Sequence, residues 1–454
     1  MHNKIKSTLL FGFISLLFVF LFSCGINESK PTSADEFYYK KIQDLNGVYG
    51  ISINGIKNEK ITKLVIPSEI ENLPVVQISN LSNLHSLKSL YVPNSVEEIG
   101  ESAFSNCENL KNIFLPRELQ HIGDMAFENC KSLKSITIPY SVMQTRFQNV
   151  FSSCTNLKKV NIYDDVTLIP QYAFYGSVYL EEINIPKSVK KIESNAFSTC
   201  LALKSIIIPD NVEIIDYGSF YRCESLVNVV FSKNLMEIGV RAFEGCKALK
   251  KINIPEGLKI ISPGAFENCD SLEEINLPST LEILSGFSNC RQLSNIAIPP
   301  NLKVVSKSAF KGCINLGSVF LPDTLTKIDS YAFKDCHKLE SIIIPSNVSS
   351  IGIESFSGCK NLKNIQLSSK IEQISSYAFD SCSSLEEIDI PNGIAKIGRC
   401  SFVSCSALKS ISIPESVNNI DATAFEDCLS IESIIRPKHL SGKINVDAKL
   451  VTYY

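Results

Sequence analysis

The stretch KIESNAFSTCLALKSIIIP, residues 191–209, contains the pattern that organises this chain. From Phe197 it reads F-x-x-C-x-x-L-x-x-I-x-I-P, and the same frame returns about every 23 residues from Phe104 to Pro437. A fixed period of this length is typical of a solenoid, in which each repeat buries its apolar side against its neighbours. The sequence therefore predicts one elongated repeat domain rather than several compact ones.

Within one repeat, residues 205–208 alternate with the period of a β-strand. We expect Ile206 and Ile208 to point inward and Ile207 to point outward. Pro209 ends the strand, because it has no N–H for the hydrogen-bond ladder. Only 14 residues separate this proline from Cys223 of the next repeat, which is too short for a long crossover helix. We therefore expect coil with about one helical turn around each A-F-x-x-C, on the side opposite the strands.

Strands that recur in this frame pair most simply in parallel, each with its equivalent in the next repeat. We predict a parallel β-sheet of 17 short strands over residues 61–437, about 80 Å long at roughly 4.8 Å per strand. The predicted strands end at Ile66, Val92, Leu115, Ile138, Ile162, Ile185, Ile208, Phe231, Ile254, Leu277, Ile298, Leu321, Ile344, Leu367, Ile390, Ile413 and Arg436.

Both ends of the array depart from the repeat. Residues 36–60 are expected to form an N-terminal cap, in which Asn54-Gly55 between isoleucines indicates a hairpin turn. Residues 438–454 are expected to form the C-terminal cap, with a closing strand over 449–454. Caps of this kind cover the open apolar faces of terminal repeats.

The N-terminus has the pattern of an export signal. Basic Lys4 and Lys6 precede an apolar run over 9–22, which is short for a spanning helix but suits a secretory signal. The run ends in L-F-S-C-G, which resembles a bacterial lipobox with Cys24 as the acylated residue. We predict a lipoprotein signal peptide at 1–23 and a polar tether at 24–35; an ordinary cleaved signal peptide and an uncleaved anchor are the alternatives.

Fourteen of the 16 cysteines occupy one repeat column, where Leu84 and Ser177 also stand. A small buried position explains such exchanges better than a bonding requirement does. Side chains stacked along an axis do not converge on a metal ion, and they point in parallel rather than toward each other. We expect buried free thiols, with disulfides between repeats as the alternative. Cys400 lies outside the column at an expected surface position, so we predict it to be the reactive thiol.

No catalytic pattern is present in the sequence. The five histidines do not form a zinc-binding motif, and there is no nucleophile elbow, phosphate loop or dinucleotide fingerprint. The net charge of −3 and the lack of a basic tract argue against a nucleic-acid binder. We predict a non-enzymatic protein without metal or cofactor, although a site built from cap residues is the alternative.

The motif C-x-x-L-x-x-I-x-I-P-x-x-V-x-x-I-x-x-x-A-F resembles the BspA-like leucine-rich repeat family over most of the chain, roughly 61–437. The resemblance implies a leucine-rich repeat solenoid on a bacterial cell surface. It also implies adhesion to host matrix proteins or to other microbes, and it supplies no catalytic residues. We expect a monomer anchored at the cell surface or outer membrane that binds proteins or glycans, with a structural envelope component as the alternative.

The outward column that contains Ile207 is the best place to look for a binding site. Solvation favours polar residues there, yet apolar residues occur as neighbours in Tyr91 with Phe114, Ile207 with Val230, and Phe320 with Ile343. A lysine stripe runs beside the first pair: Lys88, Lys111, Lys134 and Lys158. We predict a site for an anionic glycan or acidic protein segment there; the alternative is ordinary β-propensity beside a charged edge.

Overall fold

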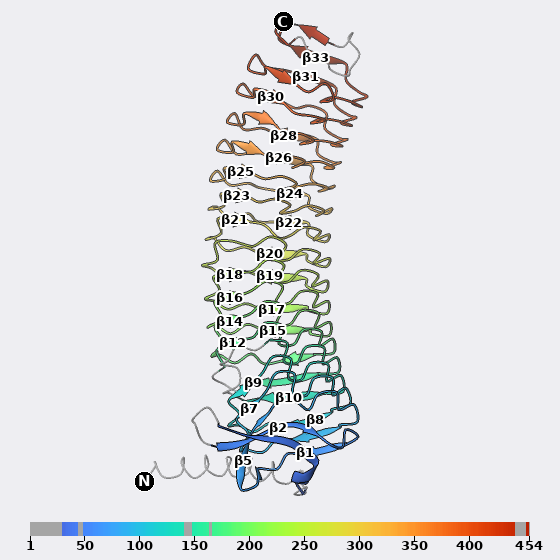
Figure 1. Cartoon of the computed structure of the whole chain (residues 1–454). Helices are drawn as coiled ribbons and strands as arrows, with labels where there is room; N and C mark the ends of the chain where they lie inside the picture. The colour runs from blue at the N-terminus through green and yellow to red at the C-terminus, as the bar shows by residue number, and fades with distance from the viewer. Residues whose placement is uncertain (1–29, 44–48, 140–147, 163–165, 441–450, 454) are drawn as a thin grey trace, which may run out of the picture.

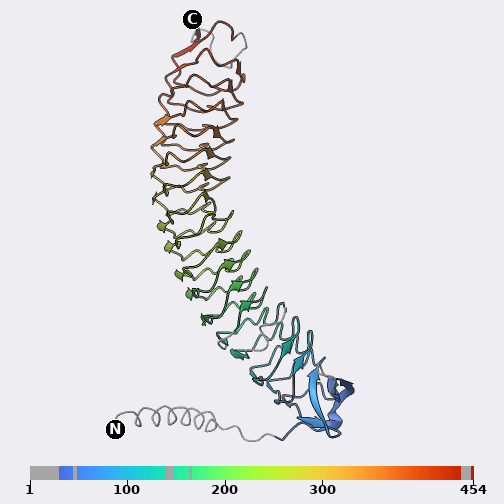
Figure 2. The ribbon, with the colours of Figure 1, turned by 90° about the vertical axis from the view of Figure 1, so that its left-hand side faces the viewer.

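The computed structural model describes residues 30–43, 49–139, 148–162, 166–440 and 451–453. These residues wind into an elongated, gently bent solenoid whose repeats stack one on the next (Figures 1 and 2). The predicted acylation site Cys24 and the apolar run before it lie outside the described residues. Within the described ranges, no helix has the length and apolar character needed to span a membrane.

The predicted strands form a parallel series that we call the first ladder, which confirms the repeat frame. Equivalent residues pair across repeats, as Ile206 does with Val229. Every predicted strand is present except the one ending at Ile390, where residues 385–390 form no strand. The first ladder comprises β3 (Lys63–Val65), β6 (Ser89–Tyr91), β8 (Asn112–Phe114), β10 (Ser135–Ile138), β11 (Lys159–Ile162), β13 (Glu182–Ile183), β15 (Ser205–Ile207), β17 (Asn228–Val230), β19 (Lys251–Asn253), β20 (Glu274–Asn276), β22 (Asn295–Ile296), β24 (Ser318–Val319), β26 (Ser341–Ile343), β28 (Asn364–Gln366), β31 (Ser410–Ser412), β33 (Ser433–Arg436) and β34 (Val451–Tyr453).

A second parallel ladder, which the sequence analysis missed, runs along another side of the solenoid (Figure 1). Its strands lie between the proline and the A-F-x-x-C turn of each repeat. They are β5 (Leu73–Ile78), β7 (Glu98–Ile99), β9 (His121–Ile122), β12 (Leu168–Ile169), β14 (Lys191–Ile192), β16 (Ile214–Ile215), β18 (Glu237–Ile238), β21 (Ile283–Leu284), β23 (Val304–Val305), β25 (Lys327–Ile328), β27 (Ser350–Ile351), β29 (Gln373–Ile374), β30 (Lys396–Ile397) and β32 (Asn419–Ile420). Most have two residues, too few for alternation to be visible in sequence.

The expected helical turns around A-F-x-x-C are tight turns instead. The only helix in the described ranges is the three-residue η1 (Ala34–Glu36). Each turn contains residues in the left-handed region, such as Asn195 at φ 55° and Thr199 at φ 60°, which a right-handed helix cannot accommodate. Backbone bonds join the turns of neighbouring repeats, since Phe197 N–H donates to the Ser219 carbonyl at 2.8 Å. The turns therefore form a third line of contacts between repeats.

Phenylalanines and cysteines fill the core between the two ladders and the turns. The 15 phenylalanines from Phe104 to Phe425 stack on their neighbours with ring centroids 5.0–6.1 Å apart. Thirteen of the 14 column thiols donate to the carbonyl of the phenylalanine one repeat back, as Cys223 does to Phe197 at 3.2 Å, and Cys107 donates to the Leu81 carbonyl at 3.5 Å. Every described cysteine is a free thiol, as expected.

Cys400 is not at the surface, so the prediction that it is the reactive thiol was wrong. Its residue is only 8% exposed, and its thiol lies 3.2 Å from the Thr423 hydroxyl of the next repeat. The backbone at Cys400 is left-handed, with φ 49°, and this conformation turns the side chain back against the neighbouring turn. Among the described cysteines, only Cys428 at the C-terminal end of the column is partly exposed.

The N-terminal segment forms a hairpin, but not with the predicted turn. Strand β1 (Phe37–Gln43) pairs antiparallel with β2 (Tyr49–Ile56), so the chain reverses between residues 43 and 49. Asn54-Gly55 lies within β2, where a register shift between Tyr38 and Tyr39 leaves Asn54 as a β-bulge. Strand β2 then pairs in parallel with β5, so the hairpin extends the second ladder rather than the first.

A second, tighter hairpin accounts for the extra residues of the first repeat. Strand β4 (Glu69–Ile70) pairs antiparallel with β5. Glu71 and Asn72 connect them, and both have positive φ, 53° and 62°, as a two-residue type I′ turn requires. At the other end, β34 pairs in parallel with β33 and is the closing strand expected from the sequence.

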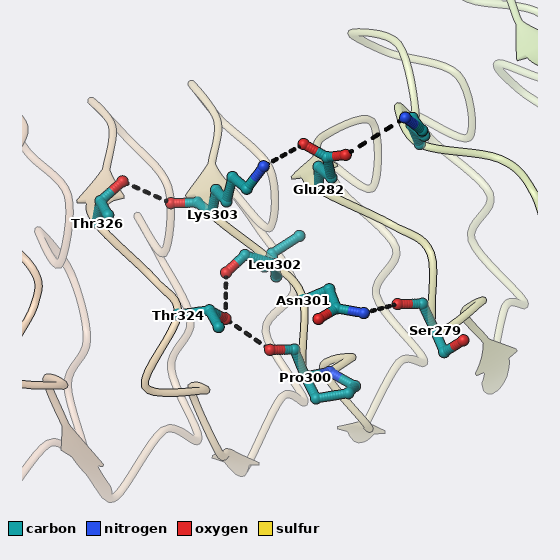
Figure 3. Close-up of polar contacts among 9 residues, drawn as sticks. Ser279, Glu282, Pro300, Asn301, Leu302, Lys303, Thr324 and Thr326 are labelled. Carbon is teal, nitrogen blue, oxygen red and sulfur yellow. Dashed lines mark hydrogen bonds and ion pairs between the residues drawn. The ribbon is translucent and has the colours of Figure 1, made fainter.

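Side-chain bonds to backbone also join successive repeats, as Figure 3 shows near the middle of the array. The Thr324 hydroxyl donates to the carbonyls of Pro300 and Leu302, at 2.6 and 2.9 Å. The amide of Asn301 donates to the Ser279 carbonyl one repeat back, at 2.9 Å. These bonds satisfy backbone carbonyls outside the ladders and fix the position of each repeat on the next.

Candidate binding surface

Two aromatic side chains form an exposed pair near the N-terminal end of the first ladder. Tyr91 ends β6 and Phe114 ends β8, and the two residues are direct partners in the parallel register. Strand alternation buries Leu90 and turns both rings outward, 42% and 51% exposed. Their centroids lie 6.2 Å apart with the planes tilted by 40°. This arrangement presents a nearly continuous aromatic surface on a rigid sheet.

The lysine stripe is built by the residue that precedes each strand of the first ladder. The backbone holds these residues in line: Lys111 N–H donates to the Lys88 carbonyl, and Lys158 N–H to the Lys134 carbonyl, both at 2.9 Å. All four lysines are exposed. The side chains therefore emerge at intervals of roughly 5 Å beside the aromatic pair.

The four lysines of the stripe differ in their ion pairing, which was not predicted from the sequence. Lys158 forms an ion pair with Glu181 of the next repeat, N–O 3.0 Å. No ion pair joins Lys88, Lys111 or Lys134 to any described residue, and each of them has another lysine of the stripe in the adjacent repeat. Three adjacent positive charges without a counter-charge repel one another by roughly 1 kcal/mol per neighbour in water. They also attract negatively charged groups such as carboxylates or sulfates.

Elsewhere in this column, each lysine has a glutamate one repeat away: Lys204 has Glu181, Lys250 has Glu273, and Lys363 and Lys409 have Glu386. In the same column as the stripe, Lys409 pairs with Glu386 at 2.9 Å. On the opposite side of the proline turn, Glu282 lies between Lys303 and Lys259, two of the contacts drawn in Figure 3. The stripe at Lys88–Lys134 thus differs from the rest of its column, because none of its three lysines has a glutamate beside it in the column.

The other two predicted pairs lie on the same ladder but far from the stripe. Ile207 and Val230 are register partners on β15 and β17, and both are exposed. Phe320, 85% exposed, follows β24, and Ile343 ends β26. Four repeats, roughly 19 Å, separate Phe114 from Ile207, and the same interval separates Val230 from Phe320. The ten predicted residues therefore form three separate patches and not one site.

The C-terminal patch borders a shallow depression on the first ladder. Ile343, Gln366 and Asp389 of three successive repeats contribute to its lining. The depression is open and carries a carboxylate beside apolar surface, so its chemistry differs from that of the lysine stripe. Within the described residues, no cluster of His, Cys, Asp or Glu is arranged to bind a metal ion.

A further depression lies on the turns, where the sequence analysis proposed nothing. It is lined by four tyrosines, Tyr172, Tyr175, Tyr217 and Tyr221, together with Asn195, Ser198 and Arg241. The sequence does contain a signal for this depression: two tyrosines stand at the turn around Phe174, and two more stand at the turn around Phe220, two repeats later.

Comparison with known proteins supports the family indicated by the motif. The BspA type leucine rich repeat region matches residues 76–204, 190–313, 284–388 and 326–446. A search of curated proteins gave no match.

Several solved structures are similar in fold. A leucine-rich repeat protein from Bacteroides ovatus is 26% identical, with a TM-score of 0.65 over 94% of this chain and 100% of its own. A leucine rich cell surface protein from Faecalibacterium prausnitzii is 26% identical over 91% of this chain and 96% of its own, with a TM-score of 0.38. The T. pallidum leucine rich repeat protein is 33% identical over 48% of this chain and 91% of its own, with a TM-score of 0.36. Since the matched repeats run from residue 76 to residue 446, this chain belongs to the BspA type leucine-rich repeat family.

Proposed function

We propose that this protein is a lipid-anchored cell-surface protein that binds proteins or glycans through the outward face of its first ladder. Membership of the BspA type family supports a role in protein interaction. The description of a similar protein as a cell surface protein fits an exposed location. The lipobox-like sequence at Cys24 supports anchoring at the membrane.

The observation that carries the proposal is the unpaired part of the lysine stripe beside Tyr91 and Phe114. An aromatic pair contributes apolar contact area with little loss of side-chain entropy on binding. Adjacent lysines add attraction for negative charge and raise the association rate. Together these features fit an anionic glycan or an acidic protein segment, in agreement with the prediction from sequence.

Anchoring is tested by acylation at Cys24. Radiolabelled palmitate should enter the wild-type chain and not Cys24→Ala, and the variant should leave the detergent phase. An unlabelled wild-type chain would contradict the anchor while leaving the binding proposal intact.

Binding is tested with the chain from Gly25 onward, which lacks the acylated residue. This boundary keeps Thr32, whose N–H donates to the Val65 carbonyl at 2.9 Å beside the first strand of the array. Capture of an anionic glycan or acidic matrix protein from a defined panel would support the proposal. Failure to bind any member would favour the alternative, a structural envelope component without a soluble ligand.

A further inference from the structure

The tyrosine depression on the turns has two aromatic walls and a small polar floor. One wall is Tyr172 with Tyr175, and the other is Tyr217 with Tyr221, two repeats away. The turn ladder sets this register: Gly176 N–H donates to the Ser198 carbonyl at 3.0 Å, and Thr199 N–H donates to the Tyr221 carbonyl at 2.7 Å. Two repeats correspond to roughly 10 Å between the walls. That separation leaves room for one ring between the tyrosines of the two repeats.

Both walls are held by contacts within the protein. The rings of Tyr172 and Tyr175 meet edge to face, with centroids 5.7 Å apart and an interplanar angle of 83°. On the other side, the Arg241 guanidinium lies over the Tyr221 ring, 5.4 Å from its centroid, and donates to the Tyr217 hydroxyl at 3.4 Å. Side chains fixed in this way lose little entropy when a ligand binds.

The depression carries no net charge of its own. Arg241 donates through two nitrogens to the carboxylate of Glu244, whose residue is 7% exposed. Its positive charge is therefore compensated within the wall. The intervening repeat supplies Asn195 and Ser198 as the floor, and no side-chain hydrogen bond joins the Asn195 amide to any described residue. The cavity measures about 360 Å³, near the lower end of small-molecule sites, which run from about 300 to 1,000 Å³.

From this geometry we propose that the depression binds a neutral pyranose sugar between its two tyrosine walls. The C–H groups on the faces of a sugar ring suit aromatic surfaces, and the hydroxyls at its edge suit the Asn195 amide, since Ser198 on the floor is only 1% exposed. Two aromatic walls require a ring that is flat on both faces, which is the case when all hydroxyls are equatorial, as in β-glucose. An axial hydroxyl, as on C4 of galactose, would meet one wall. A proline-rich peptide also stacks on tyrosines, but the polar floor favours the sugar.

This site lies apart from the lysine stripe, so the two proposals can fail independently. The test uses the chain from Gly25 onward, with binding followed by calorimetry and by tyrosine fluorescence, which is unobscured because the chain has no Trp. Cellohexaose should bind, β-1,4-galactohexaose should bind at least tenfold more weakly, and Tyr175→Ala with Tyr221→Ala should weaken cellohexaose binding at least tenfold. Tyr331→Ala with Tyr377→Ala is the matched control, since both residues occupy the turn position of Tyr172 in other repeats. It should leave binding unchanged.

Three results would overturn the inference. One is equal binding of the two hexasaccharides, and another is undiminished cellohexaose binding by the Tyr175 and Tyr221 variant. The third is binding of decaproline, and not of cellohexaose, with loss in that same variant, which would assign the slot to a peptide. Circular dichroism and thermal melting of both double variants establish that they are folded, so a loss of affinity reports on the site itself.

Discussion

At the scale of single residues, the cysteine column shows why a thiol suits its buried position. Each column thiol donates to a backbone carbonyl one repeat back at 3.0–3.5 Å, which belongs to Leu81 for Cys107 and to a phenylalanine for the other thiols. Ser177 occupies the same column, is fully buried, and its hydroxyl has no hydrogen-bond partner among the described residues. The shorter C–O bond gives serine less reach than cysteine has.

We therefore expect Ser177→Cys to stabilise the protein by about 1 kcal/mol, because it restores a bond to the Phe151 carbonyl and removes an unsatisfied hydroxyl. Urea denaturation measures the change. Cys200→Ser in the next repeat is the control and should destabilise the protein. A loss of stability in Ser177→Cys would contradict this account of the column.

Burial also determines how the thiols titrate. It raises the pKa of Cys107, Cys154 and Cys313 to about 12, and that of the partly exposed Cys428 to about 11. In the unfolded chain these thiols ionise near pH 8.5, so above that pH the unfolded state binds fewer protons than the folded state. Their contribution to stability is complete below pH 8.5 and is lost as the pH rises toward 12.

The free energy of unfolding should accordingly fall between pH 8.5 and 11, by up to about 1.4 kcal/mol per pH unit for each such thiol. Denaturation in urea at successive pH values measures this slope. In the folded state at pH 8, the described cysteines should react slowly with a thiol reagent, with Cys428 first. A flat stability profile, or rapid labelling of Cys400, would disagree with the burial observed here.

At the scale of the elements, the stacked phenylalanines link each repeat to the next. Phe220 stacks on Phe197 and Phe243, whereas Phe425 has one stacking neighbour, Phe402. Phe220 and Phe425 are both buried, with exposed fractions of 0% and 1%. In a linear array, a central residue supports two interfaces and a terminal one supports a single interface.

Phe220→Ala should therefore cost about 3–5 kcal/mol, and Phe425→Ala distinctly less. Chemical denaturation followed by far-ultraviolet circular dichroism measures both values. Equal losses of unfolding free energy at the two positions would argue against a linear array, in which the contributions of successive interfaces add up.

Sequence predicted the first ladder well and other elements poorly, for identifiable reasons. Alternation over four residues and the proline after Ile208 define the first ladder, while the two-residue β14 leaves no periodic trace. Asn54-Gly55 has the composition of a turn, but pairing with β1 makes it a bulge. Cys400 seemed exposed because it lies outside the cysteine column, and only its backbone conformation reveals the contact with Thr423.

At the scale of the whole molecule, repetition places similar residues in long columns, and the candidate binding residues stand where a column changes. The aromatic pair and the lysine stripe could be predicted from the sequence, because register in a solenoid follows from the period. Their ion pairing could not be predicted, since Lys158 and Lys134 occupy equivalent positions and differ only in a neighbouring Glu181. The return of tyrosines after two repeats indicates the tyrosine slot in the sequence, but its shape depends on side-chain contacts across three repeats.

We expect Lys88, Lys111 and Lys134, which form no ion pair with any described residue, to bind negatively charged ligands together with Tyr91 and Phe114. The most direct measurement is the salt dependence of affinity for a heparin hexasaccharide, comparing the chain from Gly25 onward with a variant in which Lys88, Lys111 and Lys134 are alanine. Lys259→Ala with Lys303→Ala is the matched control, because Glu282 already compensates both of these lysines.

We expect the triple variant to bind more weakly, with a flatter dependence on salt and an unchanged melting temperature, and the control to bind like the wild type. The same affinity and salt dependence in the wild type and the triple variant would contradict this expectation.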